Sequence, residues 1–300
     1  MEEPDTLAVD WSGALRRARS TIWLAEARDR ALVRLERGRD RREIVDHLVE
    51  MARRRRSIVV GLDFAFSFPA WFLGERGLRS ASEGWSLVRE DGERWLAACS
   101  QPFWGRKGRR RPPADSDRLP YRRTESRRPP LRGVGPKSVF QIGGAGAVGT
   151  GSLRGMPFLP ELRAAGFSIW PFDPPRLPMI VEIYPRWLTG SVRKTSAIAR
   201  ALHLASRFRD LDPALADLAA STEDAFDAAV SALRMAEHAS AFVELPQARD
   251  DVEALEGGIW SPLEDPCCAL PHPGGSRILP ASRAGRPARE IEWNASSSPR

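Results

Sequence analysis

The chain has 300 residues, of which 42% are hydrophobic and 28% charged, a balance typical of a globular protein large enough to bury a sizeable core. No apolar run approaches the roughly 18 residues that a membrane-spanning helix needs, which argues against a membrane protein. The formal charge of +7 is concentrated in residues 105–132, where eleven Lys or Arg face three Asp or Glu; this segment carries +8 and the rest of the chain −1. Any signal for a polyanionic partner is therefore confined to one segment.

The N-terminal part of the sequence predicts the start of a mixed sheet. Residues 6–13 (TLAVDWSG) are typical of a buried strand that ends in an acid. In residues 21–29 and 31–38, apolar and polar residues alternate, as is typical of short strands. Residues 40–56 predict an amphipathic helix with an aspartate as its N-cap and arginines in its last turn. Residues 57–69 predict a second buried strand. This order indicates three antiparallel strands and a helical crossover to a parallel fourth.

The middle of the chain is less regular, and the part after residue 186, to about residue 242, is predicted to be mostly helical. A helix over residues 82–99 precedes the basic segment, whose five prolines and missing apolar periodicity predict a mobile loop. We expect one domain over residues 1–262 and a poorly ordered tail over residues 263–300. The other expected elements are a short helix at 156–165, strands at 167–172 and 179–186, helices at 193–208 and 222–245, and a late strand or sheet closure at 254–262.

A glycine-rich stretch spells the dinucleotide-binding pattern Gly144-x-Gly146-x-x-Gly149. Residues 137–142 predict the strand that this pattern needs before it. The glycines and the proline that follow, however, are expected to break the helix that should open on Gly149. We therefore predict no dinucleotide site. The stretch either brings backbone N–H groups near an anion, with Gly144 and Gly146 as the phosphate loop, or is a plain turn.

Five acids occur where burial would penalise them. Asp10 ends the first buried strand, Asp63 lies between apolar residues, Glu182 lies within MIVEIYP, and Asp224 and Asp227 share one face of a helix. A buried carboxylate costs several kcal/mol unless it is paired or binds a metal. Each acid alone is most simply a cap or an ion-pair partner. If three or more converge, we expect a site for Mg²⁺ or Mn²⁺, which prefer oxygen ligands.

The order of these elements resembles the RNase H-like fold, and the helix EDAFDAAVSAL resembles the acidic C-terminal helix of Holliday-junction resolvases. Six ordered motifs resemble more closely the domain-of-unknown-function family numbered 429, described as predicted RNase H-like nucleases. They are AVDWSG, GLDFAFSFP, SVFQIGGAGAVGTGSLRGMPFL, WPFD, VEIYPR and DAFDAAVSAL. The resemblance spans roughly residues 7–262. It implies an α/β fold, with an RNase H-like mixed five-stranded sheet of three antiparallel strands and then parallel strands, flanked by helices.

The resemblance implies a metal-dependent nuclease that hydrolyses phosphodiester bonds. Asp10 and Asp227 would hold one Mg or Mn ion, Asp63 or Glu182 would complete a second site, and Asp224 is a further candidate ligand. The basic segment would hold a nucleic-acid backbone, with Trp11 or Trp104 stacking on a base; the alternative is a solvated loop. The expected nucleic-acid contacts are Arg106, Lys107, Arg109, Arg110, Arg111, Arg122, Arg123, Arg127 and Arg128.

Two other functions remain open. Ser12 and Gly13 follow a buried strand and resemble the phosphate turn of actin-like ATPases and sugar kinases, which would make the protein an ATP-binding phosphotransferase. A non-catalytic nucleic-acid-binding scaffold with the same fold is the third possibility. The acidic N-terminus predicts no signal peptide. An odd number of cysteines, three, without a C-x-x-C pair predicts a reducing compartment, so a cytoplasmic location is expected.

Overall fold

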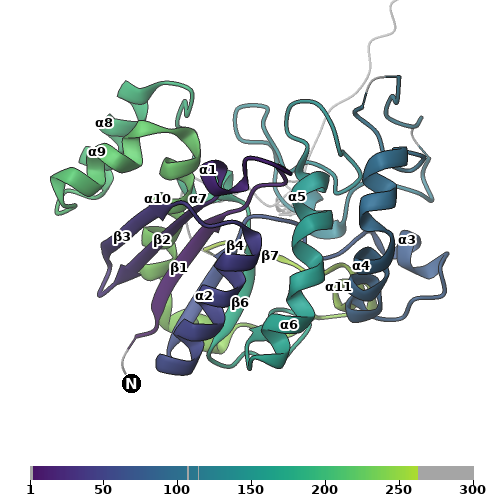
Figure 1. Ribbon diagram of the computed structural model, residues 1–300, viewed down its shortest axis with the longest axis horizontal. Coiled ribbons are helices and arrows are strands. Elements are labelled where there is room, and N and C mark those ends of the chain that lie inside the picture. The colour runs from purple at the N-terminus through teal and green to yellow at the C-terminus, as the bar shows by residue number, and fades with distance from the viewer. Residues whose placement is uncertain (1–2, 107, 114, 263–300) are drawn as a thin grey trace, which may run out of the picture. The chain divides into compact units, whose positions relative to one another are not determined.

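The computed structural model describes residues 3–106, 108–113 and 115–262 (Figure 1). The predicted tail at 263–300 and the candidate residue Lys107 lie outside the described residues. Seven strands form one sheet in the order β3-β2-β1-β4-β6-β5, and β7 also pairs with β6. The strands are β1 (Asp5–Asp10), β2 (Trp23–Arg28), β3 (Ala31–Arg37), β4 (Ile58–Leu62), β5 (Ser168–Ile169), β6 (Met179–Ile183) and β7 (Ile259–Trp260).

The sheet is mixed, as predicted. β2 is antiparallel to both β1 and β3, whereas β1, β4, β6, β5 and β7 pair in parallel. The prediction of five strands is wrong in number, because the two-residue strands β5 and β7 also pair with β6. β5 pairs with its beginning (Met179 and Ile180) and β7 with its end (Glu182 and Ile183). Both lie within elements that the sequence analysis expected, at residues 167–172 and 254–262, although only two residues of each form a strand.

Helices cover both faces of the sheet (Figure 1). On one face Leu7 and Val9 of β1 pack into a core with Ile44 and Leu48 of α2, while on the other Ala8 packs into a core with α10. This alternation follows from the two-residue period of a strand. The α-helices are α1 (Ala18–Thr21), α2 (Arg41–Arg54), α3 (Ala70–Gly74), α4 (Ala81–Ala98), α5 (Val148–Gly155), α6 (Leu159–Ala164), α7 (Pro185–Thr189), α8 (Ala197–Arg207), α9 (Pro213–Ser221), α10 (Glu223–Ala236) and α11 (Asp251–Glu256).

Helix α10 approaches the sheet closely. A Cβ on Gly61 of β4 would lie only 2.7 Å from the sulfur of Met235, and the Thr6 hydroxyl donates a hydrogen bond to the Ala232 carbonyl (2.9 Å). The small residues of the helix allow this contact, and Thr222 caps its N-terminus by accepting from Ala225 N–H (3.0 Å). The cap holds the N-terminal end of α10, and the contacts with Thr6 and Gly61 hold its C-terminal end against the sheet. Together they fix the orientation of the acidic first turns of α10 relative to β1.

Around the glycine-rich stretch the structure reverses both predictions. Residues 137–142 form no strand, and Gln141 makes only an isolated bridge to Trp104. The helix that was not expected does form, as α5. A Cβ on Gly149 would lie 2.0 Å from the Val139 carbonyl oxygen, and one on Gly155 would lie 2.7 Å from the Phe64 ring. These glycines therefore allow close packing that outweighs their low helix propensity.

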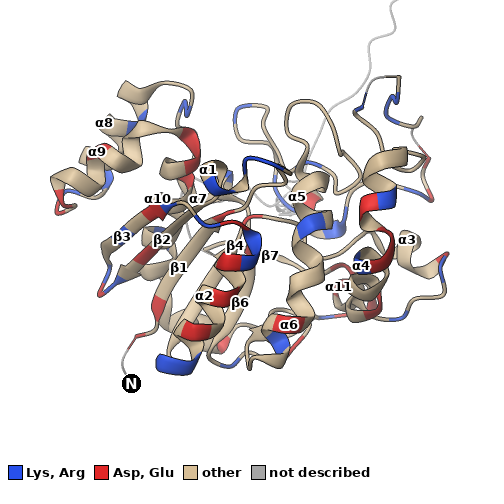
Figure 2. Ribbon diagram, viewed as in Figure 1, with Lys and Arg blue, Asp and Glu red and all other residues tan. Residues whose placement is uncertain are grey.

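The basic segment is partly anchored, which corrects the prediction of a mobile loop. A 3₁₀ turn, Arg123–Ser126, lies in it, and Arg127 pairs with Glu253 of α11 (2.8 Å). Figure 2 shows further lysines and arginines on the loops around α4 and α5. Among the helices of the described chain, none combines the length and the apolar character that crossing a bilayer requires.

Candidate active site

Two of the candidate acids are brought together by strand pairing. Asp10 is the last residue of β1, and Asp63 directly follows β4. These strands are parallel neighbours, with Val9 opposite Leu62, and Asp63 N–H donates to the Val9 carbonyl (3.1 Å). The register therefore places both carboxyl groups at the same edge of the sheet. The two side chains lie close enough for each to affect the pKa of the other.

Asp227 joins them from α10. It lies in the second turn of the helix and is only 8% exposed. Its Oδ2 accepts from the Lys194 ammonium, whereas its Oδ1 is buried and has no hydrogen-bond partner within the described chain. A buried acceptor without a donor is costly, so this oxygen is available for a ligand.

The pKa values show that the acids interact. Burial, then the charges of Asp63, Asp227 and Asp224, raise the pKa of Asp10 well above its ordinary value. Burial and then the charge of Asp227 raise the pKa of Asp63 to about 8. Asp10 and Asp63 are nevertheless both partly exposed to solvent. Burial raises the pKa of Asp227 to about 6, with Lys194 opposing the shift. Burial and then the charge of Glu223 also raise the pKa of Asp224. Burial, and after it the repulsion between the carboxylates, therefore disfavours the charged forms of these acids.

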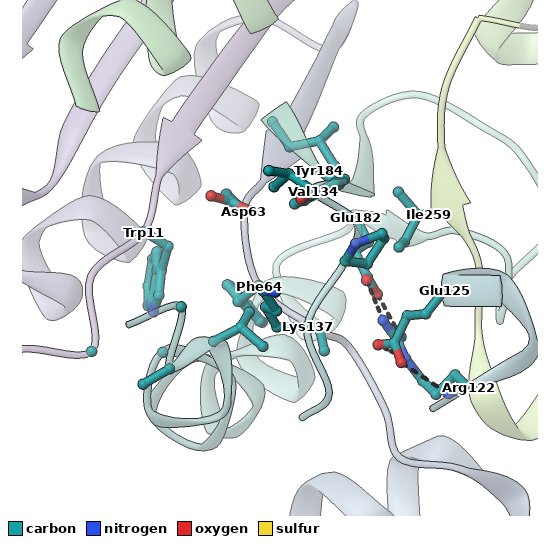
Figure 3. Close-up of a pocket in the computed structure, with 18 residues that line it drawn as sticks. Trp11, Asp63, Phe64, Arg122, Glu125, Val134, Lys137, Glu182, Tyr184 and Ile259 are labelled. Atoms are coloured by element: carbon teal, nitrogen blue, oxygen red, sulfur yellow. Dashed lines mark hydrogen bonds and ion pairs between the residues drawn. The ribbon is translucent and has the colours of Figure 1, made fainter. Parts of the chain in front are cut away.

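Glu182 has a different role from the one predicted. Its carboxylate accepts from both terminal nitrogens of Arg122 (2.8 and 2.5 Å) and from Phe66 N–H (2.9 Å). Figure 3 shows this pair beside Glu125, which Arg122 also contacts through Nε (3.0 Å). Glu182 lies near enough to raise the pKa of Asp63. Its own charge, however, is already neutralised by a buried guanidinium, so the structure does not place it among the free carboxylates.

Lys194 is one of two residues beside the acids that the sequence analysis missed. It precedes α8 in the basic stretch RKTS, where nothing distinguishes it from a solvated surface lysine. In the structure it is half-buried and opposes the charges on Asp10, Asp63 and Asp227. Tyr184 was also missed; it follows β6, and burial followed by Asp63 raises its pKa to about 12. Only the tertiary fold brings these two residues to the acids.

The expected nucleic-acid contacts divide into two groups. Arg122 is only 1% exposed, so its guanidinium cannot reach a phosphate, which corrects that prediction. Arg123 and Arg127 are paired with Asp250 and Glu253, Arg128 lies over the Trp187 ring, and Arg111 lies over Trp104 and Tyr121. The exposed residues Arg106, Arg109 and Arg110 make no ion pair with any described side chain.

The candidate phosphate loop is mainly a packing contact. A Cβ on Gly13 would lie 2.6 Å from Gly151 N, so glycine lets the turn after β1 rest against α5. The Ser12 hydroxyl accepts from Ala14 N–H (3.2 Å). At the start of α5, Gly149 N–H already donates to the Gln141 carbonyl (3.0 Å), which leaves it unavailable to an anion. Gly144 and Gly146 have φ of 76° and 75°, values that favour glycine.

Two adjoining cavities open at this edge of the sheet. One of about 260 Å³ is lined by Asp63, Asp227, Lys194 and Arg193. The other, of about 330 Å³, is lined by Trp11, Phe64 and Glu182 among others (Figure 3). Asp63, Val134 and Tyr184 line both. A ligand that reaches the acids can therefore extend into either space.

Comparisons with family models, curated proteins and solved structures gave no match to this chain. Conclusions about its chemistry therefore depend on the site itself.

The candidate donors are carboxyl oxygens, the ligand type that hard divalent cations prefer. Three carboxyl groups converge, they repel one another, and one buried oxygen of Asp227 has no partner in the described structure. Within the described ranges, no group of three or more Asp, Glu, His or Cys side chains is arranged so that it could hold a metal ion. The Lys194 ammonium is paired with Asp227 Oδ2.

The raised pKa values predict that the metal-free protein loses stability as the pH rises. The folded-state pKa is about 8 for Asp63 and about 6 for Asp227, against 3.8 for an ordinary aspartate. The folded state therefore retains protons that the unfolded state has lost, and this stabilisation is complete below pH 3.8 and disappears as the pH rises through 6 and 8. In chelator we expect the melting temperature to fall by several degrees between about pH 5.5 and 8.5.

Asp63→Asn should make this pH dependence weaker. The variant is needed because burial also raises the pKa of Glu125 to about 7, and this shift likewise makes the protein less stable as the pH rises. Melting curves of the wild type and the variant in the same buffers separate the two contributions. Equal slopes in both proteins would assign the pH dependence to groups outside the cluster.

Proposed function

We propose that the protein is a metal-dependent nuclease that hydrolyses phosphodiester bonds at the cluster of Asp10, Asp63 and Asp227. The observation that carries the proposal is the convergence of these acids from β1, β4 and α10, with Asp227 Oδ1 buried and unpartnered in the described chain. The antiparallel β1–β2–β3 unit beside parallel β4 supports an RNase H-like core. So do the motifs that resemble the family numbered 429.

Asp10, Asp63 and Asp227 would hold Mg²⁺ or Mn²⁺, with half-buried Asp224 one turn earlier on α10 as a supporting charge. When bound, the cation activates water and stabilises the negative charge that develops on the phosphate. The chain contributes the rest of the site. β1, β4 and α10 hold the carboxylates in place, and Tyr184 and Val134 border the approach to Asp63.

Lys194 supplies a second, permanent positive charge. Its ammonium contacts Asp227 and lines the same cavity as Asp63. An ammonium on a flexible stem can exchange a carboxylate partner for a phosphate oxygen. We therefore assign Lys194 to neutralising the cluster in the free protein and to holding a phosphate oxygen when substrate is bound.

The exposed arginines of the basic segment support a nucleic-acid substrate. Arg106 lies close enough to Glu93 to lower its pKa, after the larger effects of Arg154, and Arg154 donates to the Gly13 carbonyl beside the acids. The charge of Arg106 therefore lies near Glu93 and Arg154, and Arg154 in turn contacts the turn that follows Asp10. Arg106, Arg109 and Arg110 would bind the charged phosphates of the nucleic-acid backbone. Such contacts do not depend on the base sequence.

The test is cleavage of end-labelled nucleic acids by the purified protein with Mg²⁺ or Mn²⁺. Single strands, duplexes and four-way junctions of DNA and RNA should be compared, with chelator as the negative control. Cleavage that requires the metal and is lost in the Asp227 variant discussed below supports the proposal. Absence of cleavage on every substrate would refute it.

Replacing Lys194 by Met should separate metal binding from turnover. Removing the ammonium leaves the carboxylates less compensated, so we expect Mn²⁺ to bind at least as tightly as in the wild type. Cleavage should nevertheless fall by roughly 10-fold to 100-fold, because one phosphate contact is lost. Calorimetric titration with Mn²⁺ and cleavage kinetics measure the two effects.

Arg193→Met is the matched control, since Arg193 lines the same cavity but makes no ion pair with a described carboxylate. We expect it to change cleavage by only a few-fold. If Lys194→Met weakened Mn²⁺ binding, or left cleavage intact, Lys194 would have only a structural role.

A further inference from the structure

The larger cavity beside the acids has properties that the carboxylate chemistry does not use. It measures about 330 Å³ and extends from Asp63 to the buried Arg122–Glu182 pair. Trp11, Phe64 and Tyr184 contribute aromatic surface to it, and the rings of Trp11 and Phe64 are in contact with centroids 5.1 Å apart (Figure 3). This combination of flat apolar walls with a few polar groups is typical of a small-ligand pocket.

Two polar groups that line the cavity, the Trp11 indole and the Lys137 ammonium, lack partners among the described residues. The Trp11 indole N–H is buried, on a side chain that is 7% exposed, and finds no acceptor among the described residues. Lys137 is exposed, lines the cavity and forms no ion pair with the described acids; a Cβ on Gly146 would lie 3.1 Å from its Cγ. Glu182 by contrast is engaged by Arg122. The two unpartnered groups are therefore an indole N–H and an ammonium, and both lie beside aromatic rings. Such a set complements an aromatic heterocycle that is joined to a phosphate.

We propose that this cavity binds the base and sugar of one unpaired nucleotide, whose phosphate lies between Lys137 and Asp63. The inference rests on the proposed nuclease function and names its substrate class: a single strand, or a nucleotide extruded from a duplex. A volume of about 330 Å³ lies at the small end of ligand pockets and holds one nucleoside, whereas a base pair does not fit. Stacking on aromatic side chains binds any base, and a single strand avoids the energy of unpairing.

Binding to the metal-free protein tests the inference without requiring catalysis. In chelator, a labelled single-stranded oligonucleotide and its duplex are titrated by fluorescence anisotropy, and a nucleoside monophosphate by calorimetry. We expect the single strand to bind at least about 10-fold more tightly than the duplex. Lys137→Ala and Ala147→Trp, which would fill the cavity from its rim, should each weaken binding of the single strand and of the monophosphate by about 10-fold.

Arg53→Ala is the matched control, since it removes an exposed cation of α2 whose side chain is 74% exposed. It should leave the monophosphate affinity unchanged. Equal affinity for single strand and duplex, or normal monophosphate binding by both cavity variants, would overturn the inference even if the protein is a nuclease. Loss of monophosphate binding in both variants would uphold the cavity as a nucleotide site even if no cleavage is found.

Discussion

Asp227→Asn is expected to reduce metal-dependent cleavage by roughly 1,000-fold or more, equivalent to about 4 kcal/mol of transition-state stabilisation. The amide keeps the size of the side chain and one acceptor oxygen, but it removes the charge that a cation requires. Thermal stabilisation by Mn²⁺ should disappear in the same variant. Both effects follow from the position of Asp227 Oδ1, which is buried without a partner in the described structure.

Stability measurements distinguish a ligand from an ordinary ion pair. The charged form of Asp227 is already disfavoured in the folded protein, since its pKa is raised to about 6. Removing the charge relieves repulsion with Asp10 and Asp63, which still compensate Lys194, so the metal-free variant should be as stable as the wild type or slightly more stable. Asp217→Asn on the exposed surface of α9 is the control and should cleave normally. Wild-type cleavage by Asp227→Asn would refute its assignment to the active site.

Arg122→Met is expected to destabilise the fold by about 3–5 kcal/mol, because it leaves two buried carboxylates without their cation. Arg122 and its partners Glu125 and Glu182 have side chains that are at most 3% exposed. The guanidinium also donates to the Glu256 carbonyl (3.1 Å), which links the basic segment to the end of α11. Urea denaturation measures the change in the free energy of unfolding.

The triple variant Arg122→Met/Glu125→Gln/Glu182→Gln should recover part of the lost stability, since it removes the uncompensated charges together with the cation. If Arg122→Met alone changed the free energy of unfolding by less than about 1 kcal/mol, the ion pair would be dispensable. That outcome would reopen Glu182 as a candidate metal ligand and Arg122 as a candidate phosphate contact.

Much of the sheet follows from local sequence patterns. The alternation around Leu7 and Val9, the turn at Asp29 and Arg30, and the capped helix after Asp40 are local signals for β1 to β4 and α2. Because β1 and β4 are adjacent and parallel, the acids that end them were predictable neighbours. Asp227 was also predictable as a buried acid, since it interrupts a run of small residues on an amphipathic helix.

The tertiary structure alone decided which charges are compensated. Glu182 and Asp63 look alike in the sequence, as single acids at the ends of buried strands, yet one is paired with Arg122 and the other is not. Lys194 and Arg122 lie in basic stretches that predict solvent exposure, and both became partners of buried acids across 33 and 60 residues. The glycines of α5 oppose a helix locally but allow it to pack against the Val139 carbonyl and Phe64. Ion pairing and close packing depend on distances between residues remote in the chain, and local propensity and periodicity carry no record of those distances.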